Sequence, residues 1–357
     1  MIGKHSIVLI LFSQLLLSVV DTTNVYAQDP NFSQFYNNPV YYNPAMTAIG
    51  KGYTFRANAR NLWSPIPGRF NTFSGAFEGE VLNKLGIGVM GFSDVAGEGL
   101  LRTTGGYLSY SYRPVETKNF MMQFGITGGL INKNIDWSRL TFSDQYNEIA
   151  GNISPSQFVA PNYNSVLYPD FGTGMAIRFN QTSKKKGTYK KMIATAGFSF
   201  QHLNQPKDAF LLETQYLPLK FVLHGNTAIL LGDNILSPGF IFERQREFQT
   251  FTLGASLVKK PIVVGVWFRN RTYLMSVKSY DSFIFSVGTN QTFSKERNLR
   301  ITYSIDFTIS RLRTSSFGSH ELSLIFDLDN RYLLKNHQRK KSRNRMYKCP
   351  DDFMGYD

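Results

Sequence analysis

The stretch Leu299–Ser310 reads LRITYSIDFTIS and decides the fold class. Its odd positions carry Leu, Ile, Tyr, Ile, Phe and Ile, whereas its even positions carry Arg, Thr, Ser, Asp, Thr and Ser. Successive side chains of a β-strand point to opposite faces, so this segment has one apolar face and one polar face. The same period of two recurs at Pro261–Asn270 and at Phe171–Phe179. These segments predict β-strands.

Segments of about ten residues with this alternation follow one another along the chain. We count fourteen of them, at 52–61, 70–80, 84–93, 99–112, 119–131, 169–180, 190–202, 218–230, 234–243, 247–257, 261–270, 280–290, 298–309 and 320–329. An even number of strands of this length is typical of a transmembrane β-barrel. We therefore predict an all-β fold, an outer-membrane barrel of about 14 antiparallel strands within residues 48–330.

The connections between these segments fall into two length classes. One set is short, at 81–83, 113–118, 181–189, 231–233, 258–260 and 291–297, and the other includes 132–168 and 203–217. Outer-membrane barrels have short periplasmic turns and longer outer loops. Because an even number of strands returns the chain to its starting side, we expect both the N-terminus and the C-terminus to be periplasmic.

A soluble β-sandwich or barrel is the alternative fold, because strands in water also alternate. Charged residues make up only 18% of the 357 residues, which is low for a soluble surface. The polar faces carry mostly Gly, Ser, Thr and Asn, and such small side chains suit a crowded lumen. The only cysteine, Cys349, excludes a disulfide scaffold. These features favour the membrane barrel.

Residues 1–27 have the features of a secretory signal peptide. A short basic start precedes the apolar stretch Ser6–Val20, and Val25-Tyr26-Ala27 supplies small residues before a cut. A signal anchor is the alternative, but an apolar stretch of 15 residues is short for crossing a membrane. We expect cleavage after Ala27, which leaves Gln28 as the mature N-terminus.

The mature chain shows no pattern that indicates catalysis or metal binding. Its histidines, which stand outside any HExxH motif or His–Cys cluster, are His202, His224, His320 and His337. Gly86-Ile87-Gly88 and Gly172-Thr173-Gly174 lie inside predicted strands, so they favour tight packing rather than nucleotide binding. A hydrolase in the barrel wall would need a nucleophile and a base in contact. We therefore expect no enzymatic activity, no cofactor and no metal.

Charged side chains within the strands are expected to face the lumen, because a charge facing lipid at mid-depth costs ~2–4 kcal/mol. This set comprises Arg56, Arg60, Glu78, Arg178, Arg269, Arg300 and Asp306. Since both signs are present, we predict a lumen cross-linked by ion pairs and plugged. A conducting pore is the alternative.

The segment 28–47 lacks alternation and is rich in Asn, Pro, Phe and Tyr. Its Asp-Pro and Asn-Pro steps favour turns. Burial of each large aromatic side chain contributes ~1.5–3 kcal/mol, and the segment carries Phe32, Phe35, Tyr36, Tyr41 and Tyr42. We predict that it folds into or against the periplasmic mouth of the barrel and helps to close it.

The C-terminal segment 331–357 is basic, with eight Lys or Arg residues and three Asp. Its core is Arg339, Lys340, Lys341, Arg343, Arg345, Lys348 and Cys349. We expect a periplasmic tail that meets an anionic periplasmic partner or anionic outer-membrane lipid. Nucleic acid is not expected as a partner of an exported protein, despite the charge.

Short motifs occur in a fixed order along the mature chain. QDPNFSQFY at 28–36 precedes NPA at 43–45, and Trp63 follows the first strand. HLNQP at 202–206, LPLK at 217–220, GSHE at 318–321 and CP at 349–350 come later. In this order and spacing the motifs resemble the PorP/SprF family of type IX secretion system outer-membrane proteins. Candidate residues for partner binding or mouth closing are Gln28, Asp29, Pro30, Phe32, Ser33, Gln34, Tyr36, Asn43, Pro44, Trp63, His202, Asn204 and Pro206.

The resemblance implies an accessory outer-membrane barrel that anchors or helps to export secreted surface proteins, including gliding adhesins. Such clients carry a type IX C-terminal secretion domain. The resemblance also implies contacts with periplasmic or outer-membrane components of the secretion and gliding machinery. A FadL-like or porin-type transport channel is the alternative function.

Overall fold

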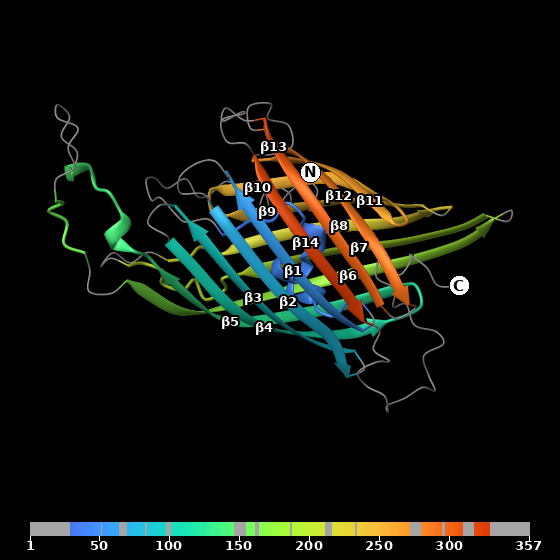
Figure 1. The fold of residues 1–357 in the computed structure, drawn as a ribbon. Coiled ribbons are helices and arrows are strands. Elements are labelled where there is room, and N and C mark those ends of the chain that lie inside the picture. The colour runs from blue at the N-terminus through green and yellow to red at the C-terminus, as the bar shows by residue number, and fades with distance from the viewer. Residues whose placement is uncertain are drawn as a thin grey trace, which may run out of the picture.

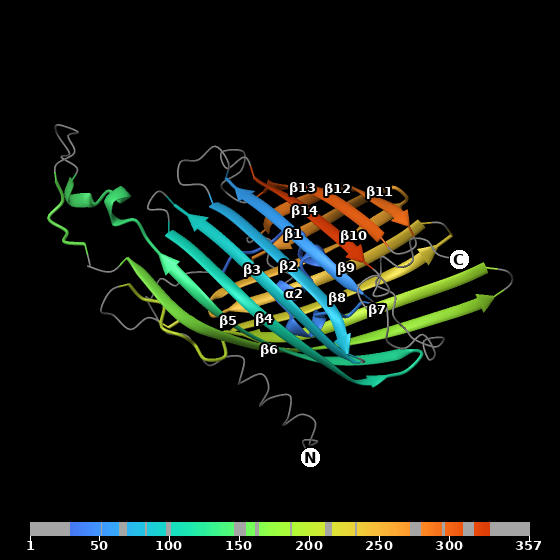
Figure 2. The same cartoon turned by 60° about the horizontal axis from the view of Figure 1, so that its bottom comes forward.

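The computed structural model describes residues 29–50, 52–63, 70–82, 84–97, 101–145, 155–160, 164–185, 188–210, 216–232, 234–271, 280–294, 297–309 and 318–328. The expected signal peptide (1–27), Gln28 and the expected basic tail (331–357), with Cys349, lie outside these residues. The described strands form one closed antiparallel barrel (Figures 1 and 2).

The barrel contains fourteen strands among the described residues. They are β1 (Tyr53–Leu62), β2 (Phe70–Leu82), β3 (Leu85–Ala96), β4 (Leu101–Glu116), β5 (Phe120–Asn134), β6 (Ser165–Lys185), β7 (Thr188–Gln201), β8 (Lys220–Leu231), β9 (Asn234–Gln245), β10 (Phe248–Lys259), β11 (Ile262–Asn270), β12 (Tyr280–Ser294), β13 (Arg297–Thr308) and β14 (Ser319–Leu328). Sequential strands pair, and β1 pairs with β14 to close the barrel. Each predicted segment coincides with a strand, so the predicted fold is confirmed.

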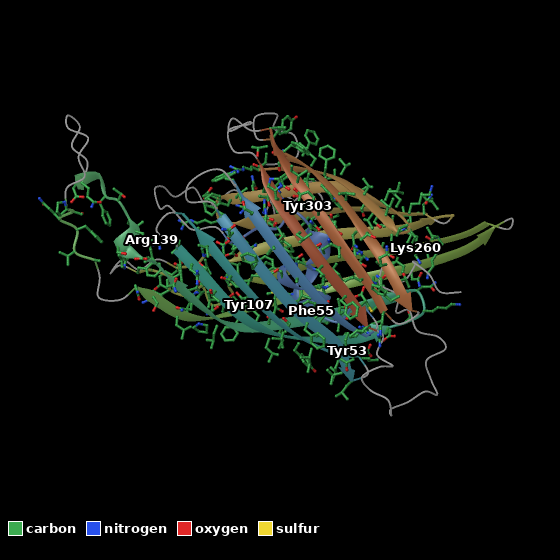
Figure 3. All side chains as sticks on the ribbon, in the orientation of Figure 1. Tyr53, Phe55, Tyr107, Arg139, Lys260 and Tyr303 are labelled. Atoms are coloured by element: carbon green, nitrogen blue, oxygen red, sulfur yellow. The ribbon has the colours of Figure 1, made fainter. Side chains whose placement is uncertain are left out.

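The two ends of the barrel differ in the length of their connections. At one end, which we call the short-turn end, β1 begins and β14 ends, with Tyr53 opposite Leu328. β6 ends at Lys185 and β7 begins at Thr188, so most of the connection expected at 181–189 belongs to these two strands. The other end carries the connections 135–164 and 202–219, and we call it the long-loop end. Lys260 and Arg139 mark these two ends in Figure 3.

The wall is apolar outside and polar inside. On β13, Tyr303 and Phe307 are 41% and 51% exposed, whereas Ser304 and Asp306 are 0% and 4% exposed. Tyr303 and Phe55 lie on the outer face in Figure 3. This arrangement reverses that of a soluble protein and is the one that lipid requires, since lipid cannot solvate polar side chains.

Short helical elements occur in two places. Inside the barrel lie η1 (Phe35–Asn37), α2 (Pro39–Tyr42) and η2 (Pro44–Met46), of which α2 is labelled in Figure 2. The connection between β5 and β6 holds η3 (Trp137–Arg139) and η4 (Ser143–Gln145). Among the described residues, no helix has the length and apolar character needed to cross a membrane.

Candidate functional site: the plug in the barrel lumen

The segment Asp29–Gly50, which we call the plug, passes through the lumen from one end to the other. Asp29 contacts His202, which follows β7 at the long-loop end. The carbonyl of Ile49 accepts a hydrogen bond from Arg178, near the short-turn end of β6. The chain then enters β1 at Tyr53.

This path corrects the expectation that residues 28–47 lie at the periplasmic mouth, where the short turns were placed. Only Thr47–Ile49 reach the short-turn end, and Asp29 lies at the opposite end. The physical reason is that inward polar side chains line the wall at every level, so each part of the plug finds hydrogen-bond partners there. The segment fills the lumen rather than covering one mouth.

An ion cluster holds the plug at the long-loop end. Nε2 of His202 lies 2.7 Å from Oδ2 of Asp29, and Nδ1 lies 3.0 Å from Oδ1 of Asp170. Nζ of Lys220 lies 3.7 Å from the same oxygen of Asp29. Burial disfavours the charged imidazole, but the carboxylates of Asp29 and Asp170 outweigh it and raise the pKa of His202 to about 10. A charged His202 therefore joins Asp29 to the wall.

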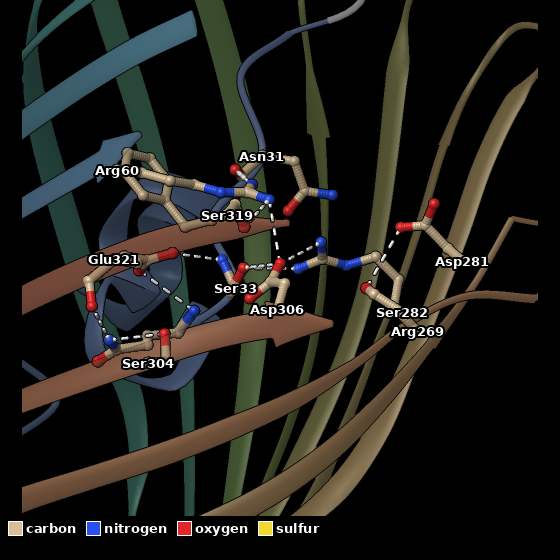
Figure 4. A network of polar contacts seen from close by, with 12 residues as sticks. Asn31, Ser33, Arg60, Arg269, Asp281, Ser282, Ser304, Asp306, Ser319 and Glu321 are labelled. Carbon is tan, nitrogen blue, oxygen red and sulfur yellow. Dashed lines mark hydrogen bonds and ion pairs between the residues drawn. The ribbon is translucent and has the colours of Figure 1, made fainter. Parts of the chain in front are cut away.

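A carboxylate on the last strand binds the plug backbone (Figure 4). Glu321 of β14 accepts the N–H groups of Ser33, at 2.6 Å, and Gln34, at 3.2 Å. The side-chain amide of Gln34 donates in turn to the hydroxyl of Ser304, at 3.0 Å. These bonds replace the solvation that the backbone loses on burial.

Asp306 of β13 joins three further groups (Figure 4). Its Oδ2 accepts from the hydroxyl of Ser33 at 2.6 Å, from Arg60 at 3.2 Å and from Arg269 at 3.1 Å. Arg60 also donates to the carbonyl of Asn31. Two guanidinium groups thus neutralise one buried carboxylate and orient the start of the plug.

The aromatic side chains of the plug are packed together inside the barrel. Phe32 and Tyr42 are each 1% exposed, and the rings of Phe32 and Tyr41 meet edge-on at 5.1 Å. The ring of Tyr36 stacks on Trp267 of β11 at 4.8 Å. The hydroxyl of Tyr41 donates to the carbonyl of Pro30. The sequence predicted that these rings leave water, and they are buried in the lumen.

Asn43 anchors the middle of the plug to the wall. Its Nδ2 donates to the carbonyls of Met175 and Phe198, at 3.1 and 3.2 Å, and lies 3.0 Å from Nε2 of His224. Its Oδ1 accepts the N–H of Ala45 at 2.8 Å, which forms the N-cap of η2.

Glycines of the wall make room for this part of the plug. A Cβ atom on Gly174 would overlap Oδ1 of Asn43, and one on Gly125 would overlap the backbone at Ala45. A Cβ on Gly197 would lie 2.8 Å from Nδ2 of Asn43. The sequence indicated tight packing at Gly172 and Gly174; Gly174 packs against the plug, whereas Gly172 packs against Thr127 and Phe200 of the wall.

The remaining predicted lumen charges also lie inside the barrel. Arg56 pairs with Glu78 at 3.0 Å and donates to the carbonyl of Asn37 at 3.3 Å. Arg178 donates to Oγ1 of Thr195 besides its contact with the plug, and Arg300 lines a cavity beside the plug.

Three motif residues pack at the long-loop end. Trp63 follows β1 directly, with its ring edge-on to Phe70 at 5.4 Å. The side-chain amide of Asn204 donates to the carbonyl of Pro169 at 2.7 Å. The carbonyl of Pro206 accepts the N–H of Leu217 at 2.9 Å. Asn204 and Pro206 belong to the connection that carries His202 and fix its shape.

Sequence reasoning missed three residues that contact the plug, which are Lys220, Trp267 and Glu321. It also missed Asp170, which pairs with His202. Each stands at an inward position of a strand, so applying the alternation to every polar or bulky residue could have found them. What the pattern cannot supply is the partner of each side chain.

The polar side chains described above bind and orient the plug. Ser199 donates its hydroxyl to the carbonyl of Tyr42, whereas His202 lies between two carboxylates. In the part of the chain that the structure describes, no cluster of His, Cys, Asp and Glu could hold a metal ion.

Solved structures with similar folds are distant in sequence. The toluene transporter TbuX of Ralstonia pickettii aligns with a TM-score of 0.44 and 9% identity, over 82% of this chain and 93% of that chain. The P. putida toluene transporter TodX gives 0.42 and 9%, over 80% and 92%. A Pseudomonas aeruginosa FadL homologue gives 0.38 and 11%, over 82% and 94%. No curated protein matches in sequence.

The sequence itself matches one family model over most of its length. The model describes the type IX secretion system membrane protein PorP/SprF and matches residues 24–326, which include the plug and all fourteen strands except the end of β14. The resemblance inferred from the motifs is thereby confirmed. The chain belongs to the PorP/SprF family of type IX secretion system membrane proteins.

Proposed function

We propose that this protein is a non-enzymatic outer-membrane anchor of the type IX secretion machinery. It holds a secreted surface protein, such as an adhesin with a type IX C-terminal secretion domain, at the long-loop end. Residues 1–27 are removed as a signal peptide during export. The long-loop end faces the cell exterior, and the short-turn end with the tail 331–357 faces periplasmic components and anionic lipid.

The plug is the observation that carries this proposal. Buried hydrogen bonds and ion pairs tie it to the wall at the long-loop end, in the middle and at the short-turn end, through His202, Asn43 and Arg178. Removing one partner of a buried pair costs about 3–5 kcal/mol, so moving the whole plug to open a channel would cost several such contacts. A permanently filled barrel suits an anchor better than a pore.

The long-loop end offers the surface for a client. The connection between β5 and β6 carries the aromatic rings of Trp137, Phe142 and Phe158, of which Phe142 and Phe158 stack at 4.5 Å. Aromatic side chains contribute much of the binding energy at protein interfaces. We place client binding on this connection.

Two measurements test the function. The full chain with a C-terminal tag is isolated from outer membranes, and co-purified proteins are identified. One variant replaces Trp137, Phe142 and Phe158 by Ser, and a control variant replaces residues 186–187 between β6 and β7. We expect the first variant to lose the secreted client and the control to retain it. Equal retention by both variants would contradict the proposed client site.

Conductance of the purified barrel in a planar bilayer separates the anchor from a channel. We expect no steady conductance from the wild-type protein. Stable single-channel steps from the wild type would instead favour a FadL-like or porin-type channel.

A further inference from the structure

A cavity of about 110 Å³ lies between the plug and the strands β8–β11 and β13. Tyr36 and Met46 of the plug form one side. On the other side, Ile235, Val258 and Val263 of β9, β10 and β11 form an apolar surface. The anchoring role described above makes no use of this space.

The charged groups that line the cavity have one sign. Arg56, Arg178 and Arg300 line it, and among the described residues its lining includes neither Asp nor Glu. A guanidinium group binds a carboxylate through paired, charge-assisted hydrogen bonds. The lining therefore favours an anionic group over a neutral or cationic one.

A buried hydroxyl stands beside one of these guanidinium groups. Thr302 lies two residues from Arg300 on β13, on the same inward face, and lines the same cavity. Thr302 is 1% exposed, and its Oγ1 has no hydrogen-bond partner within the structure described. A buried hydroxyl without a partner costs about 1–3 kcal/mol, and an anionic oxygen in the cavity would satisfy it.

We propose that this cavity is a binding site for a small amphipathic anion, with a compact apolar body of a few atoms and a single carboxylate. The apolar body packs against Ile235, Val258 and Val263, and the carboxylate accepts hydrogen bonds from Arg300 and Thr302. An apolar cavity on the order of 150 Å³ takes up benzene, so a cavity of about 110 Å³ takes a more compact ligand. The site is independent of the client-anchoring role.

Tryptophan fluorescence of the full mature chain provides the test. The protein has three Trp residues, and the double substitution Trp63→Phe, Trp137→Phe leaves Trp267 as the sole reporter. Trp267 lines the cavity and is 2% exposed, so contact quenching requires a quencher inside the lumen. The probe is trichloroacetate, and 2,2,2-trichloroethanol is its neutral counterpart.

We expect saturable quenching by trichloroacetate, with the alcohol about tenfold weaker, since one charged hydrogen bond is worth about 1.5–3 kcal/mol. Arg300→Gln should weaken only the binding of trichloroacetate, so that the two probes become equal. Ser256→Phe, which fills the cavity, should abolish quenching, whereas Leu257→Phe on the outer face should leave it unchanged.

Heat-modifiable migration on gels verifies that each variant is folded. Propionate, which does not quench, should compete with the probe and restore the fluorescence of the Trp267 reporter protein. Absence of saturable quenching would show that the cavity holds only water and would overturn the proposal. Equal quenching by both probes that is unaffected by Ser256→Phe would do the same, since it would come from the detergent micelle.

Discussion

The hydroxyl of Ser33 in the plug donates a hydrogen bond of 2.6 Å to Oδ2 of Asp306 in β13, 273 residues further along the chain. Arg60 of β1 and Arg269 of β11 reach the same oxygen. One carboxylate therefore connects the plug to strands on both sides of the seam where β1 meets β14. Docking of the plug and closure of the barrel are coupled at this residue.

Substituting Asp306 tests this coupling. Asp306→Asn leaves Arg60 and Arg269, which are 7% and 5% exposed, without their shared anion. We expect the free energy of unfolding to fall by about 3–5 kcal/mol, measured by denaturant titration of the protein in detergent.

The matched control is Asp136→Asn, because Asp136 pairs with Arg139 at an exposed position of the long-loop end. An exposed pair is screened by solvent and contributes little, so this change should be small. Equal effects of the two substitutions would show that Asp306 does not couple the plug to the seam.

A methyl group at Gly174 should dislodge the middle of the plug. The added Cβ overlaps Oδ1 of Asn43, and the plug would have to shift away from β6. Overpacking of this kind costs about 1–3 kcal/mol, and we expect a lower unfolding midpoint together with new conductance in planar bilayers.

Gly106→Ala is the control for that substitution, since nothing lies within 4 Å of a Cβ added at Gly106. Both variants change a strand glycine to alanine, so only the contact with the plug distinguishes them. If Gly106→Ala destabilised the barrel as much, overlap with Asn43 would not be the cause of the destabilisation by Gly174→Ala.

The path of the plug predicts on which side of the membrane the mature N-terminus lies. An epitope inserted between Gln28 and Asp29 should be accessible from the same side as an epitope in the connection 146–154. It should be inaccessible from the side that exposes an epitope at 186–187. Antibody binding to intact cells and to permeabilised cells measures this. The same accessibility as the 186–187 epitope would contradict the threaded path.

The contact between His202 and Asp29 should depend on pH. The pKa of His202 is raised from 6.5 to about 10 in the folded protein. A group with a raised pKa stabilises the fold fully below its unfolded pKa, and this stabilisation is lost as the pH rises through the folded value. We therefore expect the contact to hold below pH about 6.5 and to loosen between pH about 6.5 and 10.

Protease cleavage near Asp29, followed from pH 6 to 10.5, measures this change. Cleavage should rise with pH in the wild type. In His202→Gln it should already be high at pH 6 and change little with pH. Lys220 and Asp170 also face this contact, so Asp170→Asn should move the midpoint to lower pH. A flat profile in the wild type would contradict the role assigned to His202.

The sequence alone determined the barrel, because strand alternation is a local property that needs no knowledge of contacts. Leu299–Ser310 shows this directly, with inward Thr302, Ser304 and Asp306 and outward Tyr303 and Phe307 as the pattern requires. The burial of charges such as Arg178 follows from the same argument, because lipid excludes them. The family motifs were also readable without any structure.

Only the tertiary structure decided where the plug lies. Its sequence indicates that Phe32 and Tyr42 must leave water, but a mouth and a lumen both satisfy that need. The choice depends on partners far along the chain, such as Glu321 for Ser33 and Gly174 for Asn43, which meet only after the barrel has closed. The lumen width that admits the plug arises from fourteen strands together, and no single segment encodes it.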